Sequence, residues 1–319
     1  MEKVLVVGAC GQLGVELTLA LKELFGEANV IASDISQPKA ELQDGLFETL
    51  DITNRAALDE LIRKHQVTQV YHLAAILSAK GEQNPTWAWN INMAGLLNVL
   101  EAAKEHQLNK VYWPSSIAVF GHNTPRDNTP QETIMEPSTV YGVSKLAGEL
   151  WCKYYFEKYG VDVRGLRYPG LIGYKTLPGG GTTDYAVDIY HKAVNGEAFE
   201  CFLSENTYLP MMYMPDAIKA TIDLMEAAPE NVKLHTSYNI QAMSFCPADI
   251  AAEIRKEIPD FQISYKPDFR QKIADTWPSS IDDSPARTDW NWKPEFDLTK
   301  MTQDMIKNLK AQRQTAVGV

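Results

Sequence analysis

The sequence predicts an α/β fold, in which a Rossmann-type doubly wound parallel sheet is joined to a smaller C-terminal substrate lobe. Short apolar runs rich in β-branched residues alternate with amphipathic helical segments through the first half of the chain. Such alternation requires right-handed crossovers, which cover both faces of a parallel sheet with helices. The first predicted strand also ends in a glycine-rich turn, "GACGQLG", that leads directly into a helix.

Composition and charge narrow the class of protein. The 319 residues are 45% hydrophobic and 22% charged, with a formal net charge of -11. This balance is ordinary for a globular domain, and it does not favour nucleic acid as a partner. The sequence has no apolar run of membrane-spanning length and no signal-peptide pattern, so we expect a cytoplasmic protein without a membrane partner. Four scattered cysteines predict neither disulfides nor a metal site; they are Cys10, Cys152, Cys201 and Cys246.

The elements of the sheet follow one another in chain order. Apolar runs predict strands at residues 3–8, 29–34, 67–75, 110–116 and 161–170. Helical spacing predicts helices at residues 12–26, 54–66, 94–107 and 141–160, with Asn54 as the N-cap of the second.

The pattern becomes irregular after about residue 174. Helices are expected near residues 185–196, 215–227, 247–257 and 299–311. We therefore predict an NAD-binding Rossmann domain at 1–173, to which residues from about 197–245 add the last strands and helices. Residues 174–319 are predicted to form the smaller substrate-binding lobe, interleaved with that domain.

The glycine-rich turn predicts a nucleotide site. Gly8, Gly11 and Gly14, with Gln12 and Leu13 among them, stand where a pyrophosphate could approach the backbone at a helix N-terminus. Asp34 ends the second strand, where a carboxylate can accept both ribose hydroxyls and would repel a 2′-phosphate, so NAD is favoured over NADP. The alternatives are a glycine turn without a ligand and an aspartate that serves only the turn.

A second group of residues suggests proton transfer. Tyr141 and Lys145 are spaced i, i+4 on a predicted helix, so an ammonium beside the phenol could lower the pKa of the tyrosine. Ser115 and Ser116 lie at the carboxyl end of a strand, where a hydroxyl can hold a substrate oxygen. The alternatives are a Tyr/Lys pair that is merely exposed on the surface, and serines whose hydroxyls only form hydrogen bonds at the end of their own strand.

Taken together, these motifs resemble the extended short-chain dehydrogenase/reductase superfamily. "GACGQLG", "LDIT", "HLAA", "NINMAGLLNVLEAA", "SSIAVFG" and "YGVSKLAGE" occur in its order and spacing. The resemblance implies Tyr141 as the acid/base, Ser116 at the catalytic Ser/Thr position and Lys145 also on the nicotinamide ribose. It further implies that the cofactor is lined by Asp51, Ile52, Leu73, Ala74, Ala75 and Asn92, with Tyr168 to Leu171 beside the nicotinamide.

Two departures from the superfamily narrow the substrate. Sugar-nucleotide dehydratases carry an Asp-Glu pair after the catalytic Ser/Thr, where this chain has Ile117 and Ala118. Nucleotide-sugar enzymes place an arginine for the diphosphate at the position of Leu209, although Asp216 is retained. Because leucine cannot neutralise a diphosphate, we expect a small hydroxylated or carbonyl substrate.

Two later segments resemble the short-chain type of L-threonine 3-dehydrogenases. They are "PGGGTTDYAV" and "TWPSSIDDSPARTDWNWKP". The resemblance implies metal-independent oxidation of the β-hydroxyl of L-threonine by NAD, in which the glycine run acts as a hinge and lid. The implied substrate residues are Ser78, Ser116, Tyr141, Gly180, Thr182, Thr183 and Trp277.

Alternatives remain for these residues and for the whole chain. Trp277 could be core packing, and the two threonines could belong to a solvent-exposed loop. The chain could also be a nucleotide-sugar 4-epimerase or a non-catalytic NAD-binding redox sensor. The apolar residues of helices 94–107 and 141–160, together with the superfamily's usual four-helix contact, predict a homodimer.

Overall fold

The computed structural model describes residues 2–177, 179 and 181–317, and the chain forms two compact units. Unit 1 comprises Met1–Val119, Thr139–Arg167 and Ile218–Tyr238, and unit 2 comprises Phe120–Ser138, Tyr168–Ala217 and Asn239–Val319. The predicted boundary at residue 173 follows the loss of alternation along the sequence. The chain leaves unit 1 first at residue 119 and returns at residue 139, and it returns again at residue 218, within the segment 197–245 that the sequence assigns to this domain.

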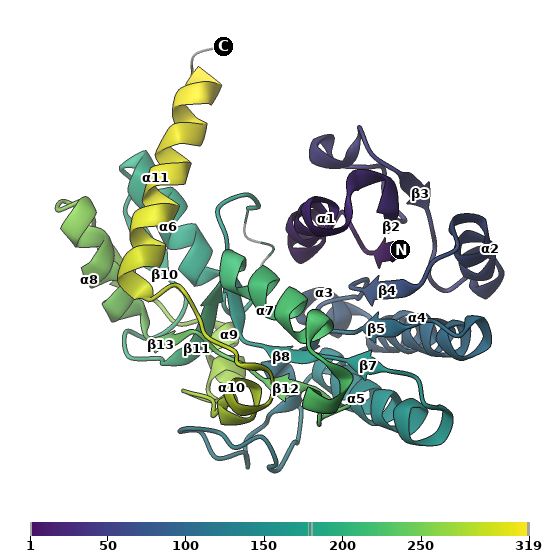
Figure 1. Ribbon diagram of the computed structural model, residues 1–319. Helices are drawn as coiled ribbons and strands as arrows, with labels where there is room; N and C mark the ends of the chain where they lie inside the picture. Colours follow the sequence, from purple (N-terminus) through teal and green to yellow (C-terminus); the bar gives the residue numbers. More distant parts are fainter. Residues whose placement is uncertain (1, 178, 180, 318–319) are drawn as a thin grey trace. The chain divides into compact units, whose positions relative to one another are not determined.

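Unit 1 is built on a parallel sheet of six strands in the order β3-β2-β1-β4-β5-β7 (Figure 1). Both neighbours of the central strand pair in the same register, since Val4 lies opposite Val30 and Gln69. The central strands are buried along their whole length, as expected for a sheet with helices on both faces. The strand bounds are β1 Val4–Val7, β2 Val30–Asp34, β3 Phe47–Thr49, β4 Gln69–His72, β5 Lys110–Tyr112 and β7 Val163–Arg164. This confirms the predicted Rossmann-like fold.

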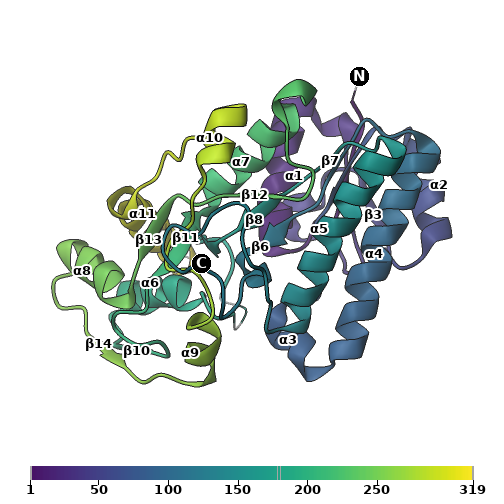
Figure 2. The ribbon, with the colours of Figure 1, turned by 90° about the horizontal axis from the view of Figure 1, so that it is seen from below.

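Helices α2, α4 and α5 lie along one face of this sheet and α1 along the other, and α4 and α5 run side by side (Figures 1 and 2). The bounds are α1 Gln12–Phe25, α2 Arg55–His65, α3 Ser78–Gln83, α4 Pro85–His106 and α5 Val140–Tyr159. Asn54 caps α2 by accepting from Ala57 N at 3.2 Å, as predicted. The next long helix starts at Pro85 instead of residue 94, because Asn84 is its N-cap and proline suits its first turn.

The predicted strand at 110–116 is divided in two. Pro114 has no N–H to donate to a ladder, so β5 ends at Tyr112 and a separate two-residue strand, β6 (Ser115–Ser116), follows. β6 belongs to a three-stranded sheet in the order β12-β8-β6, with β8 Leu166–Tyr168 and β12 Tyr238–Asn239. The two serines therefore lie outside the six-stranded sheet.

Most of the remaining elements belong to unit 2. The helices found after residue 174 confirm the four that were expected there. Strands β9 Gly170–Ile172, β11 Leu209–Tyr213 and β13 Met243–Phe245 form one sheet, and β10 Phe199–Cys201 pairs with β14 Ile263–Tyr265. Helices α6, α8 and α11 pack together. The bounds are α6 Tyr185–Asn195, α7 Met214–Glu226, α8 Pro247–Glu257, α9 Phe269–Ala274, α10 Ser284–Trp290 and α11 Leu298–Val317. Of these, α7 continues into unit 1.

Short 3₁₀ turns complete the chain at Glu27–Asn29, Ala40–Leu42, Ile117–Val119 and Pro229–Asn231. None of the helices within the described residues combines the length and the apolar character needed to cross a membrane.

Helix α5 approaches the sheet closely at Gly148. A Cβ atom at this position would lie 2.3 Å from Trp113 Cη2 and 3.0 Å from Leu96 Cδ2. The indole is 5% exposed and rigid, so it cannot yield as a flexible side-chain end could. The absence of a side chain at residue 148 therefore sets the distance between α5 and the strands beneath it.

We predict that Gly148→Ala destabilises the protein by about 1–3 kcal/mol, because overpacking against the indole outweighs the better helix propensity of alanine. Urea unfolding should show a lower midpoint with an unchanged m-value. Lys153→Ala, on the exposed side of the same helix, is the control and should stay within about 0.5 kcal/mol. Equal stability of Gly148→Ala and wild type would contradict this packing argument.

Candidate active site

The glycine turn between β1 and α1 contains two kinds of glycine. Gly8 has φ +87°, and a Cβ there would lie 2.6 Å from Ala74 N. A Cβ at Gly14 would lie 2.2 Å from Gly8 O, so the packing of the protein itself requires both glycines. At Gly11 the nearest atom, Gly8 O, would be 3.4 Å away. Packing is therefore permissive at Gly11, where α1 begins without a side-chain cap and its first N–H groups can face an anion.

Asp34 supports this turn directly. One of its carboxylate oxygens accepts from Cys10 N at 3.0 Å, and the other accepts from Ser36 N at 2.9 Å. The alternative of a turn-forming aspartate is thus realised, but each oxygen has a second lone pair that can accept a hydroxyl.

Asp51 and Ile52 follow the third strand of the sheet. Asp51 Oδ1 accepts from Thr53 N at 2.9 Å and from the hydroxyl of the same residue at 2.7 Å, which fixes the turn before α2. Ile52 is 5% exposed, and its carbonyl accepts from Asn98 on α4 at 2.9 Å. Hydrogen bonds thus hold both residues in the turn that follows β3, at the carboxyl end of that strand.

Asn92 joins the loop after β4 to helix α5. Its side-chain amide accepts from Ile76 N at 2.7 Å and donates to Ile76 O at 3.1 Å. It also donates to Ser144 Oγ at 3.2 Å, and that hydroxyl donates to Tyr141 O at 2.7 Å. The loop bonded in this way contains Leu73, Ala74 and Ala75 and leads to Ser78, the first residue of α3.

Tyr141, Ser116 and Lys145 come together at the end of β6. The side chain of Tyr141 is hydrogen-bonded to that of Ser116. The neighbouring serine, Ser115, is buried. Lys145 Nζ lies 5.5 Å from the centroid of the tyrosine ring and donates to Pro114 O at 2.6 Å. The residues predicted from the sequence to transfer a proton therefore form one cluster within unit 1.

The pKa values of Tyr141 and Lys145 differ from the expectation. Burial raises the pKa of Tyr141 to about 12, and the hydrogen bond from Ser116 lowers it only in part. The predicted lowering by Lys145 is not among the causes that act on Tyr141. Burial lowers the pKa of Lys145 itself to about 7. In the protein alone, the phenol is protonated at neutral pH and the lysine is close to its titration point.

Sequence reasoning missed a buried ion pair next to this cluster. Arg167 on β8 donates to both carboxylate oxygens of Glu149 on α5, at 2.9 and 2.7 Å. Glu149 also accepts from Ser115 Oγ at 2.6 Å. The only available signal is that Glu149 continues the i, i+4 spacing of Tyr141 and Lys145, which a helical pattern alone cannot distinguish from a surface position.

The predicted residues of unit 2 are placed as follows. Thr182 and Trp277 are 5% and 7% exposed, so neither lies in a solvent-facing loop. Thr183 packs against the backbone of β9, since a Cβ at Gly170 would lie 2.8 Å from its methyl group. Tyr168 is buried and donates to Ala217 O at 3.4 Å. Gly180, predicted to bind substrate, lies outside the described residues.

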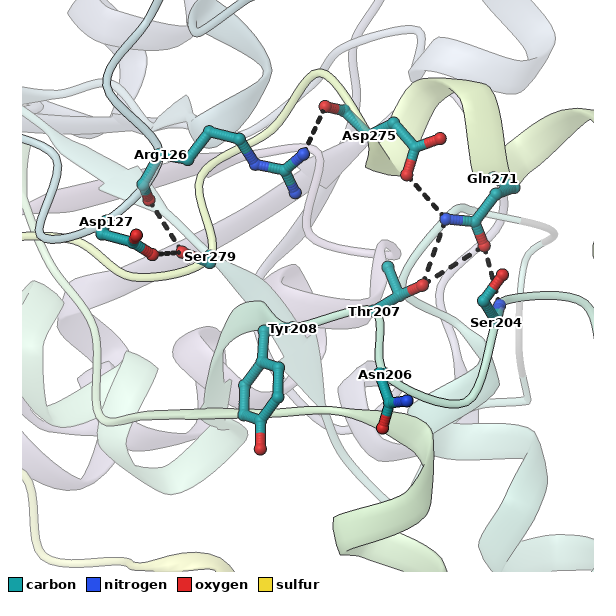
Figure 3. Close-up of a pocket in the computed structure, with 9 residues that line it drawn as sticks. All are labelled: Arg126, Asp127, Ser204, Asn206, Thr207, Tyr208, Gln271, Asp275 and Ser279. Carbon is teal, nitrogen blue, oxygen red and sulfur yellow. Dashed lines mark hydrogen bonds between the residues drawn. The ribbon is translucent and has the colours of Figure 1, made fainter.

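Unit 2 also has an open polar pocket of about 570 Å³. In Figure 3, Gln271 is central to a network that includes Ser204 N and Asp275, and Arg126 donates to Asp275 O at 2.9 Å. The other lining residues are Asp127, Asn206, Thr207, Tyr208 and Ser279. The residues predicted for the substrate are not among those that line it. Within the described ranges, no three His, Cys, Asp or Glu residues are grouped to hold a metal ion.

Comparisons with known proteins place the chain among redox and epimerising enzymes. Residues 4–240 match the family described as "NAD dependent epimerase/dehydratase". An uncharacterized epimerase/dehydratase from Staphylococcus haemolyticus is 47% identical over 98% of this chain and 99% of its own. The holo form of an L-threonine dehydrogenase from Cupriavidus necator is 58% identical, with a TM-score of 0.94 over 97% of this chain and all of that one.

A further similar structure bears on oligomeric state. It is described as a monomeric L-threonine 3-dehydrogenase from a metagenome, in apo form. It is 49% identical, with a TM-score of 0.93 over 97% of this chain and 99% of that one.

We predict that Lys145→Met removes a pH dependence of stability. Between about pH 7 and pH 10.5 the unfolded chain holds a proton on Lys145 that the folded chain has released, so the stability of the wild type rises with pH. From pH 7 to pH 9 this gain should be about 2 kcal/mol, measured by urea unfolding without added cofactor. Lys153→Met is the control and should follow the wild type. Parallel curves for wild type and Lys145→Met would contradict the lowered pKa.

Proposed function

Since the chain belongs to the NAD-dependent epimerase/dehydratase family, we propose that this NAD-dependent dehydrogenase oxidises the β-hydroxyl of L-threonine to give 2-amino-3-oxobutyrate. The observation that carries the proposal is the cluster of Tyr141, Ser116 and Lys145, which belongs to the same unit as a glycine turn where packing leaves Gly11 unconstrained. Its likeness to an L-threonine dehydrogenase over nearly the whole chain supports the choice of substrate.

Tyr141 is proposed as the general base. Its phenolate would remove the proton from the substrate hydroxyl, while Ser116, to which it is hydrogen-bonded, would hold the substrate oxygen in line. The raised pKa means that the phenolate is not present at neutral pH in the protein alone. A protonated Lys145 near the ring would favour the phenolate, so its ammonium form is the one that supports catalysis.

The residues of unit 1 fit an NAD cofactor, which supplies the hydride acceptor. The N-terminus of α1 and the permissive position at Gly11 suit the pyrophosphate. Asp34 suits the ribose hydroxyls of NAD and would repel the 2′-phosphate of NADP. We keep Asp51, Ile52 and Asn92 as proposed neighbours of the cofactor, and Lys145 as a proposed ligand of the nicotinamide ribose.

Residues of both units argue against a nucleotide-sugar substrate. Leu209 is fully buried in β11, where it pairs with Phe245, so this position offers no charge to a diphosphate. Ile117 and Ala118 are each 2% exposed and carry no carboxylate for elimination of water. These features favour a small substrate, for which we keep Ser78, Thr182, Thr183 and Trp277 as proposed contacts.

We predict that the purified protein forms NADH with L-threonine and not with a UDP-sugar. The panel should also include L-allo-threonine, D-threonine and L-serine, because a pocket discriminates one methyl group by only about 1–3 kcal/mol. Absorbance at the NADH band gives initial rates for the amino acids, and the UDP-sugar is followed by its change into the epimer, because a 4-epimerase regenerates its NAD and leaves no net NADH. Turnover of the UDP-sugar without any signal from L-threonine would overturn the proposal.

We predict that Tyr141→Phe lowers kcat by about 10²–10⁴-fold, the usual contribution of a general base, and leaves NAD affinity almost unchanged. Tyr155→Phe is the matched control, since Tyr155 lies on the same helix and bonds to Glu101 on α4. Steady-state rates with L-threonine and NAD titration by fluorescence separate the two effects. Full activity of Tyr141→Phe would exclude the proposed mechanism.

We predict a homodimer formed through α4 and α5, although a similar structure is described as monomeric. Leu150, Trp151 and Tyr154 on α5 are 58%, 39% and 45% exposed, which leaves an apolar face without cover in one chain. Light scattering at micromolar concentration should give twice the 35.7 kDa of one chain. Trp151→Glu should give a monomer, and Leu24→Glu on α1 should not. A monomeric wild type would contradict the prediction.

A cytoplasmic location also stays a proposal, in keeping with the four cysteines, which are all free thiols.

A further inference from the structure

Glu149 is a fully buried carboxylate for which the proposed reaction has no use. It lies on α5 at i+4 from Lys145 and i+8 from Tyr141, on the same side of the helix. A carboxylate without exposure is costly unless a cation and hydrogen bonds compensate its charge. The hydrogen-bond partners of Glu149 are therefore informative.

The partners of Glu149 connect the helix to two strands. Arg167, whose side chain is 2% exposed, holds both carboxylate oxygens in the bidentate geometry that fixes a carboxylate most firmly. Ser115 Oγ donates to the same carboxylate at 2.6 Å. The hydroxyl of Ser115 is thus tied to a group that is itself immobilised.

We propose that Glu149 is a positioning residue that orients the Ser116 hydroxyl toward Tyr141 by holding Ser115. Successive side chains of a strand point to opposite faces, so a fixed Ser115 determines the direction of Ser116. β6 consists of these two residues alone and follows Pro114, so the strand has little pairing of its own to hold it. This inference rests on the proposed role of Ser116.

The central test is Ser115→Ala, which removes the link but leaves the Glu149–Arg167 ion pair intact. A misplaced Ser116 should lower kcat about 10- to 100-fold, with KM values for L-threonine and NAD near those of the wild type. Ser115→Thr retains a hydroxyl and should restore most of kcat. An unchanged kcat in Ser115→Ala would overturn the inference.

A double-mutant cycle tests the role of Glu149 itself. If Glu149 acts through Ser115, Glu149→Gln should lower kcat in the wild type and have little further effect in Ser115→Ala. Fully multiplicative effects would overturn the inference. The matched control is Asp162→Asn, because Asp162 pairs with the buried Arg164 on β7, in another sheet than β6. It should lower stability and leave kcat unchanged. Where Glu149→Gln does not fold, Ser115→Ala decides alone.

Two further measurements separate this inference from the proposed function. An active Ser116→Ala variant, or a wild type inactive with L-threonine, would refute the proposed function. The positioning role is then tested without turnover, by a crystal structure of Ser115→Ala. Loss of the Ser116–Tyr141 hydrogen bond in that structure would support the inference, and its retention would overturn it.

Discussion

The burial of charge on α5 is the constraint on which the surroundings of the candidate site depend. Lys145 is 4% exposed and Glu149 is fully buried, one helical turn apart on the same side of the helix. Each therefore needs a compensating group, and these are the Pro114 carbonyl for the lysine and Arg167 for the glutamate. Because these groups lie after β5 and on β8, the charges of one helix determine where two strand ends must be.

The burial of these charges also explains why Lys145 has a shifted pKa although Glu149 lies one helical turn away. The negative charge of Glu149 raises the pKa of Lys145, but burial is the larger cause and lowers it. His72, also buried, has a pKa lowered to about 3, first by burial and then by Lys145. A lysine near its titration point responds strongly to any further charge, so the binding of a ligand beside Tyr141 can change its protonation.

Much of this arrangement could be predicted, because the signals were local. The spacing of Gly8, Gly11 and Gly14 predicted the turn, and the i, i+4 spacing predicted that Tyr141 and Lys145 share a helix face. The features that the sequence did not predict depend on contacts between distant segments. Glu149 and Arg167 are 18 residues apart on a helix and a strand, and no periodicity identifies such a partner. The division of strand 110–116 was readable at Pro114, whereas the departure of the chain from unit 1 between residues 119 and 139 was not.

The groups proposed for proton transfer and the residue proposed to exclude a diphosphate lie in different units of this chain. The groups proposed for proton transfer, Tyr141, Ser116 and Lys145, all belong to unit 1. Leu209, the position proposed to exclude a diphosphate, belongs to unit 2 and is buried within a strand. An arginine at this position would need a new exit to the surface or a compensating anion, at a cost of several kcal/mol. Creating a sugar-nucleotide site would therefore require repacking of β11 and not a single substitution, so the proposed preference for a small substrate would be built into the core.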